Sequence, residues 1–308
     1  MMLSDDFSDL TSLLLVEHIA ATGSLTAAAE KSSMTVSAAS QRLAKLERSI
    51  GQSLFVRLPR GMSPTEAGAA VIRRIGALRF EIRSIRGDLE AIQSLRAGSV
   101  RLGSFPTASA SLVSDALREF IATWPDVQVS VRSGVFPDLL EVLESGEVDL
   151  AVLWSYDFTP PWPTSILVQP LMHDPMHLLV SATSSSATTI ALAELSDASW
   201  IVRQDQHPAT QVLLRSCARA GFEPRVVYEA NDYQEVQAMV SAGVGVAMVP
   251  GLALDQLRAD VRKLAFTKNS AVPARQISLG TLDRRSLSPS MVAMTRCLQR
   301  AARALSGA

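Results

Sequence analysis

The sequence predicts a multidomain protein, with an N-terminal all-α domain, a long linker helix and a C-terminal α/β region of two lobes. Three observations predict this class. Short helical patterns separated by turn residues fill the chain up to residue 66, an apolar repeat follows, and strand and helix patterns alternate from Gly98 onward. The expected domains are residues 8–66, 67–97 and 98–308. The third is expected to form one lobe from about 98–166 and 269–308 and a second from about 167–268.

The bulk composition fits globular domains. Of 308 residues, 47% are hydrophobic and 19% are charged, which excludes an intrinsically disordered chain. The net charge of −1 excludes a uniformly basic nucleic-acid binder but leaves room for a local basic patch. Cys217 and Cys297 form no metal-binding or disulfide pattern. Because the acidic N-terminus lacks a signal-peptide pattern and no apolar run reaches membrane-spanning length, we expect a cytoplasmic, reduced protein.

The segment up to Glu66 carries the start and stop signals of successive helices. An apolar stripe begins at Leu10 and stops at Gly23, and Ser24 and Thr35 are placed to cap helices over 25–32 and 36–50. A capping box over 63–66, with Pro64 at the first helical position, predicts a fourth helix. Helix, short turn, helix is the geometry that places a second helix in the major groove of DNA. A plain three-helix bundle with a polar surface fits the same pattern.

A local excess of positive charge favours DNA binding over the plain bundle. Between Lys31 and Arg60 lie six cations and one acid, Glu47, so this segment carries a charge of +5 within a nearly neutral chain. Ser and Gln suit base edges and phosphates, and Lys suits phosphates. A hairpin after the helix over 36–50 is expected to form a wing, with Arg60 placed to enter the minor groove. The expected DNA contacts are Thr35, Val36, Ser37, Ser40, Gln41, Lys45, Arg57 and Arg60.

The helix that follows has the clearest periodicity in the chain. Its apolar residues are spaced alternately four and three apart, which is the 3.5-residue repeat of a coiled coil. A single helix cannot bury so narrow a seam, so we expect it to pair with a second copy of the chain. Packing against its own domain is the alternative. The seam consists of Val71, Ile75, Leu78, Ile82, Ile85, Leu89 and Ile92.

The ends of the predicted strands mark the expected binding site of a small molecule. Ligands of open α/β sheets bind beyond the carboxyl ends of the strands. The first strand ends near Ser104, and the start of a helix capped by Ser109 or Ser111 would favour an anion there. Each of these residues also fits an ordinary capping or loop role. The expected effector-binding residues are Ser104, Thr107, Ser109, Val135, Gln204 and His207.

Four runs of the N-terminal segment resemble the signature of LysR-type transcriptional regulators. In chain order they are Gly23–Glu30, Ser40–Glu47, Gly51–Arg57 and Thr65–Gly68. The C-terminal region resembles the effector domain of the same family at 120–125, 146–152, 220–224 and 243–250. The resemblance implies a winged helix-turn-helix, a linker helix and a two-lobed effector domain that is periplasmic-binding-protein-like, of type II.

The family's functional residues carry over where positions match. Its DNA-reading positions fall on Val36, Ser37, Ser40 and Gln41, and its wing arginine falls on Arg60. Ser or Thr at the position of Thr107 often contacts the effector in the family, whereas Val135 replaces a frequent hydroxyl residue. Two further departures are Val36-Ser37 in place of the usual Gln-Pro, and Ser32 in place of leucine. The first departure bears on which operator sequence is read.

The resemblance also implies partners. These are double-stranded DNA carrying an interrupted inverted repeat, a homodimer or tetramer of this chain, and a small-molecule co-inducer that is a carboxylate or an aromatic compound. RNA polymerase is a further candidate partner, and no membrane, cofactor or metal is implied. The expected mechanism is a population shift, in which effector binding changes how dimers pack.

Two other classes of protein compete with this interpretation. A solute-binding or sensor module could use its N-terminal helices only for assembly, but that leaves the basic segment unexplained. An enzyme with a helical arm would need a nucleophile with its base, or metal ligands, and the sequence shows neither pattern. His173 and His177 are separated by Pro175 and lack further ligands, so they are not expected to bind a metal.

Four aromatic residues near the expected crossing between the lobes have two interpretations. They could line a cleft for an aromatic ligand, or they could pack in the core or between the lobes, which is the more common role of such clusters. The cluster consists of Trp154, Tyr156, Phe158 and Trp162.

Overall fold

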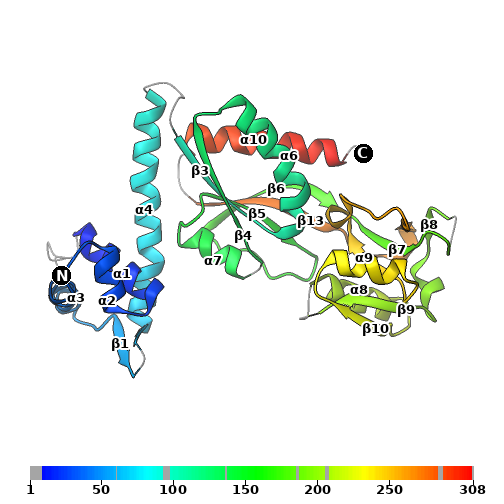
Figure 1. Ribbon diagram of the computed structural model, residues 1–308, viewed down its shortest axis with the longest axis horizontal. Helices are drawn as coiled ribbons and strands as arrows, with labels where there is room; N and C mark the ends of the chain where they lie inside the picture. Colours follow the sequence, from blue (N-terminus) through cyan, green and yellow to red (C-terminus); the bar gives the residue numbers. More distant parts are fainter. Residues whose placement is uncertain are drawn as a thin grey trace.

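The computed structural model describes residues 9–59, 61–92, 98–135, 137–184, 187–204, 208–283 and 287–306. An N-terminal domain, a long helix and two α/β lobes follow one another along the chain (Figure 1). No helix among these residues is long and apolar enough to cross a membrane.

The N-terminal domain consists of three helices and a hairpin, completed by the first turns of a long helix. Ser24 and Thr35 cap their helices as expected, by accepting hydrogen bonds from the N–H groups of Ala27 and Ala38. The hydrophobic core of the domain gathers side chains from every one of these elements. The elements are α1 (Leu10–Thr22), α2 (Leu25–Lys31), α3 (Val36–Ile50), β1 (Phe55–Leu58), β2 (Gly61–Pro64) and α4 (Glu66–Ile92).

The start of α4 differs from the expectation. Pro64 pairs with Phe55 as the last residue of β2, and the helix begins at Glu66. The cap is Thr65, whose Oγ1 accepts a hydrogen bond from the N–H of Gly68 at 3.0 Å. Pro64 belongs to the hairpin because the pairing of β1 with β2 extends to that residue. The predicted capping box at Ser63 was therefore wrong, since the cap lies two positions later, at Thr65.

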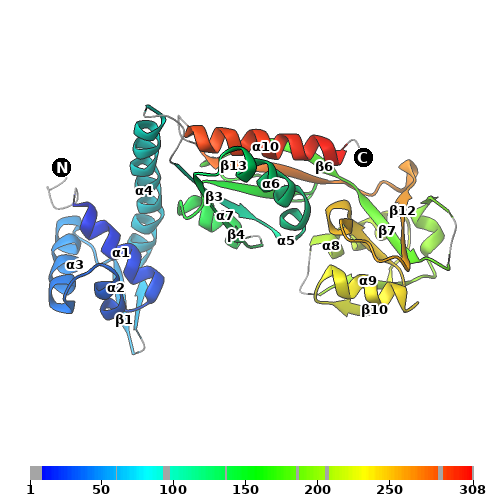
Figure 2. The same ribbon diagram turned by 45° about the horizontal axis from the view of Figure 1, so that its top comes forward.

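The first lobe, lobe I, is built on a mixed five-stranded sheet in the order β4-β3-β5-β13-β6. β3, β4 and β5 are parallel, whereas β13 runs antiparallel to both of its neighbours. α6 and α10 lie side by side over one face of this sheet (Figure 2), and α7 packs on the other. The strands are β3 (Gly98–Ser104), β4 (Val127–Ser133), β5 (Leu150–Ser155), β6 (Ile166–Asp174) and β13 (Arg275–Leu282). The helices are α5 (Pro106–Ala108), a π-helical turn (Ser109–Val113), α6 (Ser114–Thr123), α7 (Asp138–Glu144) and α10 (Pro289–Ser306).

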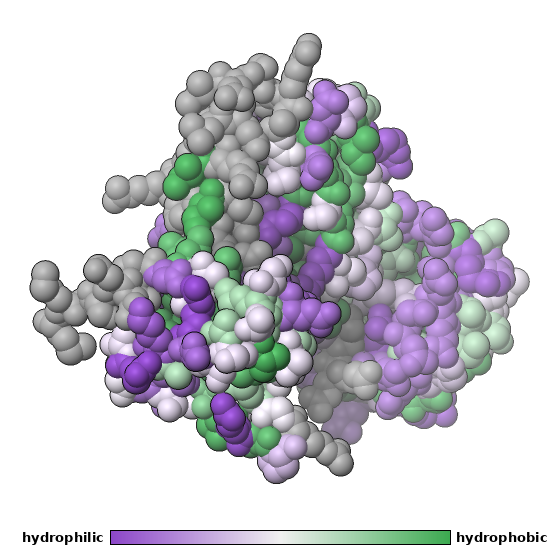
Figure 3. All heavy atoms as spheres, turned by 60° about the vertical axis from the view of Figure 1, so that its left-hand side comes forward, coloured by the Kyte–Doolittle hydropathy of each residue, from purple (hydrophilic) through white to green (hydrophobic). Residues whose placement is uncertain are grey.

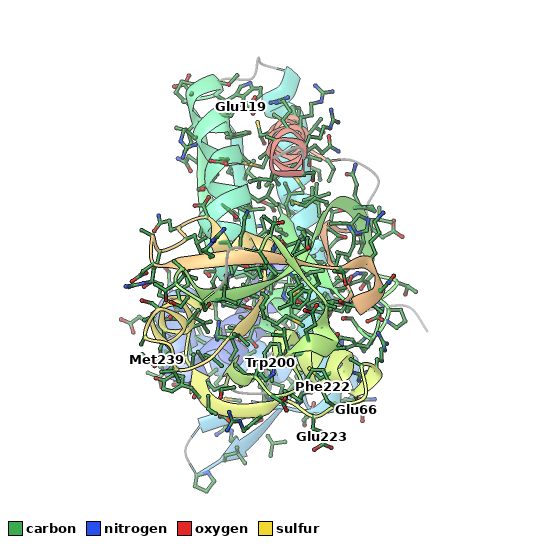
Figure 4. All side chains as sticks on the ribbon, turned by 90° about the vertical axis from the view of Figure 1, so that its right-hand side faces the viewer. Glu66, Glu119, Trp200, Phe222, Glu223 and Met239 are labelled. Atoms are coloured by element: carbon green, nitrogen blue, oxygen red, sulfur yellow. The ribbon has the colours of Figure 1, made fainter. Side chains whose placement is uncertain are left out.

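The second lobe, lobe II, has strands in the order β11-β7-β12-β8 and a separate parallel pair, β9 and β10. A bridge between Trp200 and Val246 joins the two groups. Trp200, labelled in Figure 4, is fully buried in the core that α8 covers, and α9 covers a second core. The strands are β7 (Met176–Ser181), β8 (Thr189–Ile190), β9 (Ser199–Arg203), β10 (Arg225–Ala230), β11 (Ala247–Pro250) and β12 (Val261–Phe266). The helices are α8 (Pro208–Arg219), α9 (Tyr233–Ser241) and three 3-10 turns at 192–195, 251–254 and 268–270.

The chain crosses between the lobes where β6 meets β7 and where β12 leads to β13. Because β6 pairs with β13 along its whole length, residues 166–174 belong to lobe I. The expected boundary at 166/167 therefore lies too early, and the crossing falls at Pro175 instead. A second difference is that antiparallel strands make both main sheets mixed rather than mostly parallel.

Candidate DNA-binding and effector-binding sites

α3 presents a polar face to solvent. Ser37, Gln41 and Lys45 are exposed, Ser40 is half-buried, and Val36 is 45% exposed although it is apolar. The opposite face, with Ala39, Leu43 and Leu46, is buried in the domain core. The buried face fixes the rotation of the helix, so the expected DNA-reading residues share its outer side.

The turn before α3 is held by several local hydrogen bonds. Ser33 adopts a left-handed backbone with φ of 53°, and the N–H of Met34 donates to the carbonyl of Ala29 at 2.9 Å. Ser32 ends α2, and its Oγ lies 2.8 Å from Nδ1 of His18. The hydroxyl at Ser32, where the resembled family usually has leucine, is thus matched by a polar partner on α1.

The wing is a two-stranded antiparallel hairpin tied to the rest of the domain. The carboxylate of Glu47 accepts a hydrogen bond from the N–H of Leu54 at 2.7 Å, and the N–H of Met62 donates to the carbonyl of Gly23 at 2.8 Å. Glu47, the acid within the basic segment, therefore accepts hydrogen bonds from backbone N–H groups of the wing. Arg57 is exposed on β1, whereas Arg60 lies outside the described residues.

One cation of the basic segment is compensated within the domain. Arg42 of α3 forms an ion pair with Asp9, the N-cap of α1, although both side chains are partly exposed. Burial tends to raise the pKa of Asp9, but hydrogen bonds from Ser12 and Thr11 and the charge of Arg42 hold it below its usual value. In Figure 3, which brings the N-terminal domain forward, hydrophilic side chains gather over this domain.

The apolar seam of α4 divides into two parts. Ile75 is 2% exposed and packs in the core of the N-terminal domain, with Val71 packed against that core. These two residues were expected to meet a second copy, and the structure corrects that expectation because their own domain covers them. Leu78, Ile82 and Ile85 are 39%, 39% and 60% exposed. The side chains of Leu89 and Ile92 lie outside the described part of the chain.

The segment between β3 and α6 departs from the expected capping. The helix begins at Pro106, and its N-cap, Phe105, makes no side-chain capping hydrogen bond. Ser109 and Ser111 therefore lie within the helical segment and do not cap it, because Pro106 suits the first helical position. The Ser109 hydroxyl is buried without a hydrogen-bond partner among the described residues. Ser104 is fully buried, and its expected contact with a ligand stays a prediction.

The other expected effector residues lie at strand ends of both lobes. Val135 is 52% exposed just beyond β4, whose Ser133 pairs with Ser104 at the end of β3. Gln204 follows β9 in lobe II, and its Nε2 donates to Oδ1 of Asn231. His207 lies outside the described residues.

A buried ion pair that the sequence analysis missed lies where the lobes join. Nη2 of Arg275 is 2.7 Å from Oδ2 of Asp174 and 3.1 Å from Oγ1 of Thr107, and its guanidinium lies 4.9 Å from the ring of Phe105. The other carboxylate oxygen of Asp174 accepts a hydrogen bond from the N–H of Leu252 at 2.9 Å. The pair thus holds Thr107 of lobe I, both crossing strands and the turn after β11 together.

Two tyrosines, Tyr156 and Tyr233, lie close enough to this ion pair for its charges to affect their pKa values. Burial raises the pKa of Tyr156 well above its ordinary value, against the opposing charge of Arg275. Burial also raises the pKa of Tyr233 to about 12, while Arg275 and Arg203 act to lower it. Both phenols are therefore neutral hydrogen-bonding groups near neutral pH.

The aromatic cluster packs within and between the cores. Tyr156 and Phe158 stack with ring centroids 5.4 Å apart in the core of lobe II, and Trp154 packs against the cores of both lobes. Trp162 packs against the lobe I core beside α7. The packing interpretation of this cluster is therefore confirmed. Within the described residues, no group of His, Cys, Asp and Glu is arranged to hold a metal ion.

Two family models match the chain. The model described as "Bacterial regulatory helix-turn-helix protein, lysR family" matches residues 10–69, and that described as "LysR substrate binding domain" matches residues 93–303. Among curated relatives, the HTH-type transcriptional regulator GalR of Pseudomonas putida is 28% identical over 270 residues, which are 85% of this chain and 66% of that protein. The transcriptional dual regulator GltC of Bacillus subtilis is 27% identical over 220 residues, 70% of this chain and 71% of that protein.

Solved structures show the same fold along nearly the whole chain. A full-length OxyR variant from Pseudomonas aeruginosa superposes with a TM-score of 0.74 at 19% identity, covering 96% of this chain and 94% of that one. CbnR, a LysR family transcriptional regulator, superposes with a TM-score of 0.63 at 20% identity, covering 96% and 99%. A structure of CbnR complexed with its target DNA gives the same score over 95% of this chain and 99% of that one.

Proposed function

Because the chain belongs to the LysR family of DNA-binding transcriptional regulators, we propose that α3 and the wing read an operator and that a small molecule bound at the junction of the lobes controls this binding. The single observation that carries the proposal is the outward polar face of α3, set beside the hairpin by the Thr35 cap and the Glu47 hydrogen bonds. The proposed DNA contacts are Thr35, Val36, Ser37, Ser40, Gln41, Lys45 and Arg57, with Arg60 at the wing.

The chemistry of these residues supports two kinds of contact. Gln41 carries a side-chain amide that can hydrogen-bond to a base edge, and Lys45 and Arg57 suit phosphates. Val36 offers an exposed apolar surface of the kind that contacts a thymine methyl group. Operator sequence would thus be read by the start and middle of α3, and affinity would come from the flanking cations.

We further propose that the chain forms a dimer through α4. Leu78, Ile82 and Ile85 leave an apolar surface on this helix, and a second copy would bury it. A two-fold pair of α3 helices would then require an operator with two-fold symmetry. We also propose that the dimers associate into a tetramer and that the protein contacts RNA polymerase.

The effector site is proposed to lie at the junction of the lobes and to include Thr107, Ser109 and Val135 of lobe I and Gln204 of lobe II. His207, which lies outside the described residues, is part of the same proposal. Support comes from the hydrogen bond between Thr107 and Arg275 and from the buried Ser109 hydroxyl, which has no partner among the described residues. A ligand there would touch both crossing strands, so its binding would shift the relative populations of lobe arrangements.

Selection of bound fragments from a random double-stranded DNA library tests the DNA-binding function, and it does not require the operator sequence to be known. The proposal expects enrichment of an interrupted inverted repeat by the full-length protein, and loss of that enrichment in the Ser37→Ala/Gln41→Ala variant. Failure of the folded wild-type protein to enrich any sequence would contradict it.

A further inference from the structure

Arg42 carries a positive charge on the side of α3 that also bears two of the proposed DNA contacts. Residues three and four positions apart share a face of a helix, and this stripe consists of Ala38, Gln41, Arg42 and Lys45. The stripe borders an open hollow of about 300 Å³ between α3 and the start of α1. A DNA strand that contacts Gln41 and Lys45 would therefore pass close to the guanidinium of Arg42.

The charge of Arg42 is matched by an acid of its own domain. Nη1 of Arg42 forms an ion pair with Oδ2 of Asp9, which borders the same hollow. Asp9 is the N-cap of α1, and its Oδ1 accepts a hydrogen bond from the N–H of Thr11 at 3.0 Å. Its Oδ2 also accepts one from the hydroxyl of Ser12 at 2.8 Å. A carboxylate, ionised near neutral pH, is thus anchored beside the proposed DNA-reading face.

The surroundings of this carboxylate are those that a DNA phosphate finds in a protein. Backbone N–H groups at helix starts, hydroxyls and arginines are common donors to phosphate oxygens. Asp9 accepts hydrogen bonds from all three kinds of donor. It is therefore an internal anionic partner of the type that Arg42 would otherwise find on the DNA backbone.

The exposure of the pair permits Arg42 to exchange partners. Both side chains are 37% exposed, whereas those of Arg275 and Asp174 are 4% and 1% exposed. A partly exposed ion pair contributes little to stability, so the fold does not depend on it. A phosphate beside the hollow would thus compete with Asp9 for Arg42, and the negative charge of Asp9 would oppose that phosphate.

We propose that Asp9 attenuates DNA binding by holding the charge of Arg42 away from the DNA backbone. This inference rests on the proposed function, because it concerns the affinity of the same DNA-reading helix. In the wild type the pair brings no net charge to the interface, and Arg42 makes no phosphate contact. Removal of the Asp9 charge makes Arg42 available to a phosphate, which raises the affinity for every DNA sequence alike.

The test compares the full-length wild type with Asp9→Asn and Asp9→Asn/Arg42→Gln, by fluorescence anisotropy on a selected operator and a scrambled duplex at several salt concentrations. Asn caps a helix as well as Asp does, so Asp9→Asn should keep the wild-type melting temperature. We expect it to bind both duplexes about three- to tenfold more tightly and to raise the salt dependence by about one counterion. The double variant removes a neutral pair, so its affinity and salt dependence should return to within about twofold of the wild-type values.

Glu30→Gln is the matched control. It removes the same unit of charge from an exposed residue of α2 that does not line the hollow. An equal gain in this control would show that the overall charge of the domain, and not the release of Arg42, sets the affinity. No gain in Asp9→Asn would show that the pair serves only the fold. A double variant that binds more weakly than the wild type would show that Arg42 already contacts DNA. Each of these results overturns the proposal.

The inference and the proposed function fail in different ways. If the wild type selects an operator but Asp9→Asn gains no affinity, the attenuation is wrong and the DNA-binding function stands. If the wild type selects no sequence, while Asp9→Asn gains an affinity for random duplexes that the double variant loses, operator reading is wrong and the attenuation stands. If neither protein binds any duplex, both are wrong.

Discussion

Gly76 of α4 lies directly against the backbone carbonyl of Ser145, the residue that ends α7. A Cβ atom on Gly76 would lie well inside the van der Waals radius of that oxygen, so glycine permits this close approach. α4 belongs to the DNA-binding half of the molecule and α7 to lobe I. The contact is thus a direct mechanical connection between the linker helix and the effector domain.

Replacing Gly76 by alanine is expected to separate α4 from α7 without unfolding either part. The Cβ would meet backbone atoms, which cannot rotate away, so the helix must shift. We expect the variant to retain its DNA affinity within about threefold and to lose the response of that affinity to a small-molecule effector. Anisotropy titrations with and without the effector measure both quantities. An unchanged response would show that coupling does not pass through this contact.

The Arg275–Asp174 pair should contribute strongly to stability because both side chains are almost fully buried, at 4% and 1% exposure. Asp174→Asn is expected to lower the free energy of unfolding by about 3–5 kcal/mol, since it leaves the Arg275 charge without its partner. Urea denaturation of the single variants and of Asp174→Asn/Arg275→Met measures the coupling. If the two single effects simply add, the residues do not stabilise each other.

Gln41 and Lys45 should affect DNA binding differently although they lie one turn apart on α3. Gln41→Ala is expected to weaken operator binding by about 1–3 kcal/mol and to leave binding to a scrambled duplex unchanged. Lys45→Ala should weaken both duplexes alike and reduce the salt dependence by about one counterion. Binding isotherms at several salt concentrations separate the two behaviours. Identical effects of both variants on both duplexes would contradict the assignment of Gln41 to a base edge.

The exposed part of the α4 seam should control self-association. Ile82→Asp and Ile85→Asp are each expected to weaken dimerisation at least about tenfold, because a charge would be buried at the helix pair. Leu167→Asp is a matched control, since Leu167 is 52% exposed on an edge strand of lobe I. Sedimentation velocity over a concentration series gives the association constants. Equal weakening by the control would place the interface elsewhere.

Both cysteine thiols should be unreactive in the native protein. Cys217 and Cys297 are fully buried, and burial raises the pKa of Cys217 to about 12 and that of Cys297 above its ordinary value. At pH 8 we expect no thiol titration by a disulfide reagent until the protein is unfolded, when two thiols react. Rapid labelling of the native protein would contradict the burial.

The same pKa shift has a consequence for stability against pH. The folded state favours the neutral Cys217 thiol, so its contribution is fully present below the unfolded pKa of 9.0 and is lost as the pH rises from there toward about 12. Cys217→Ala should flatten the decline in stability over that range. Denaturant midpoints at pH 8 and pH 10 measure the change.

Local signals predicted the DNA-binding half in detail. The α3 helix occupies 36–50 as expected, because its cap at Thr35 and its end at Gly51 are both set by neighbouring residues. The periodicity of α4 was also predicted correctly. The sequence did not show which residues of the seam pack within their own domain and which stay exposed. Ile75 is covered by α1 and its neighbours, and no spacing rule distinguishes a tertiary contact from a contact with a second copy.

The junction of the lobes could not be predicted in the same way. Asp174 and Arg275 stand 101 residues apart, and only the pairing of β6 with β13 brings them together. α10 carries a usable signal, because buried Met291, Met294, Leu298 and Ala302 stand at helical spacing along one face of the helix.

The most direct test of the account measures binding of the full-length protein to a selected operator and to a scrambled duplex of the same length, by fluorescence anisotropy at about 50 and about 200 mM salt. We predict an operator affinity at least about 10³-fold tighter than that for the scrambled duplex at the higher salt, and a loss of most of this ratio in the Ser37→Ala/Gln41→Ala variant. Equal affinities for the two duplexes, or a ratio that the variant leaves intact, would contradict the central claim that α3 reads DNA.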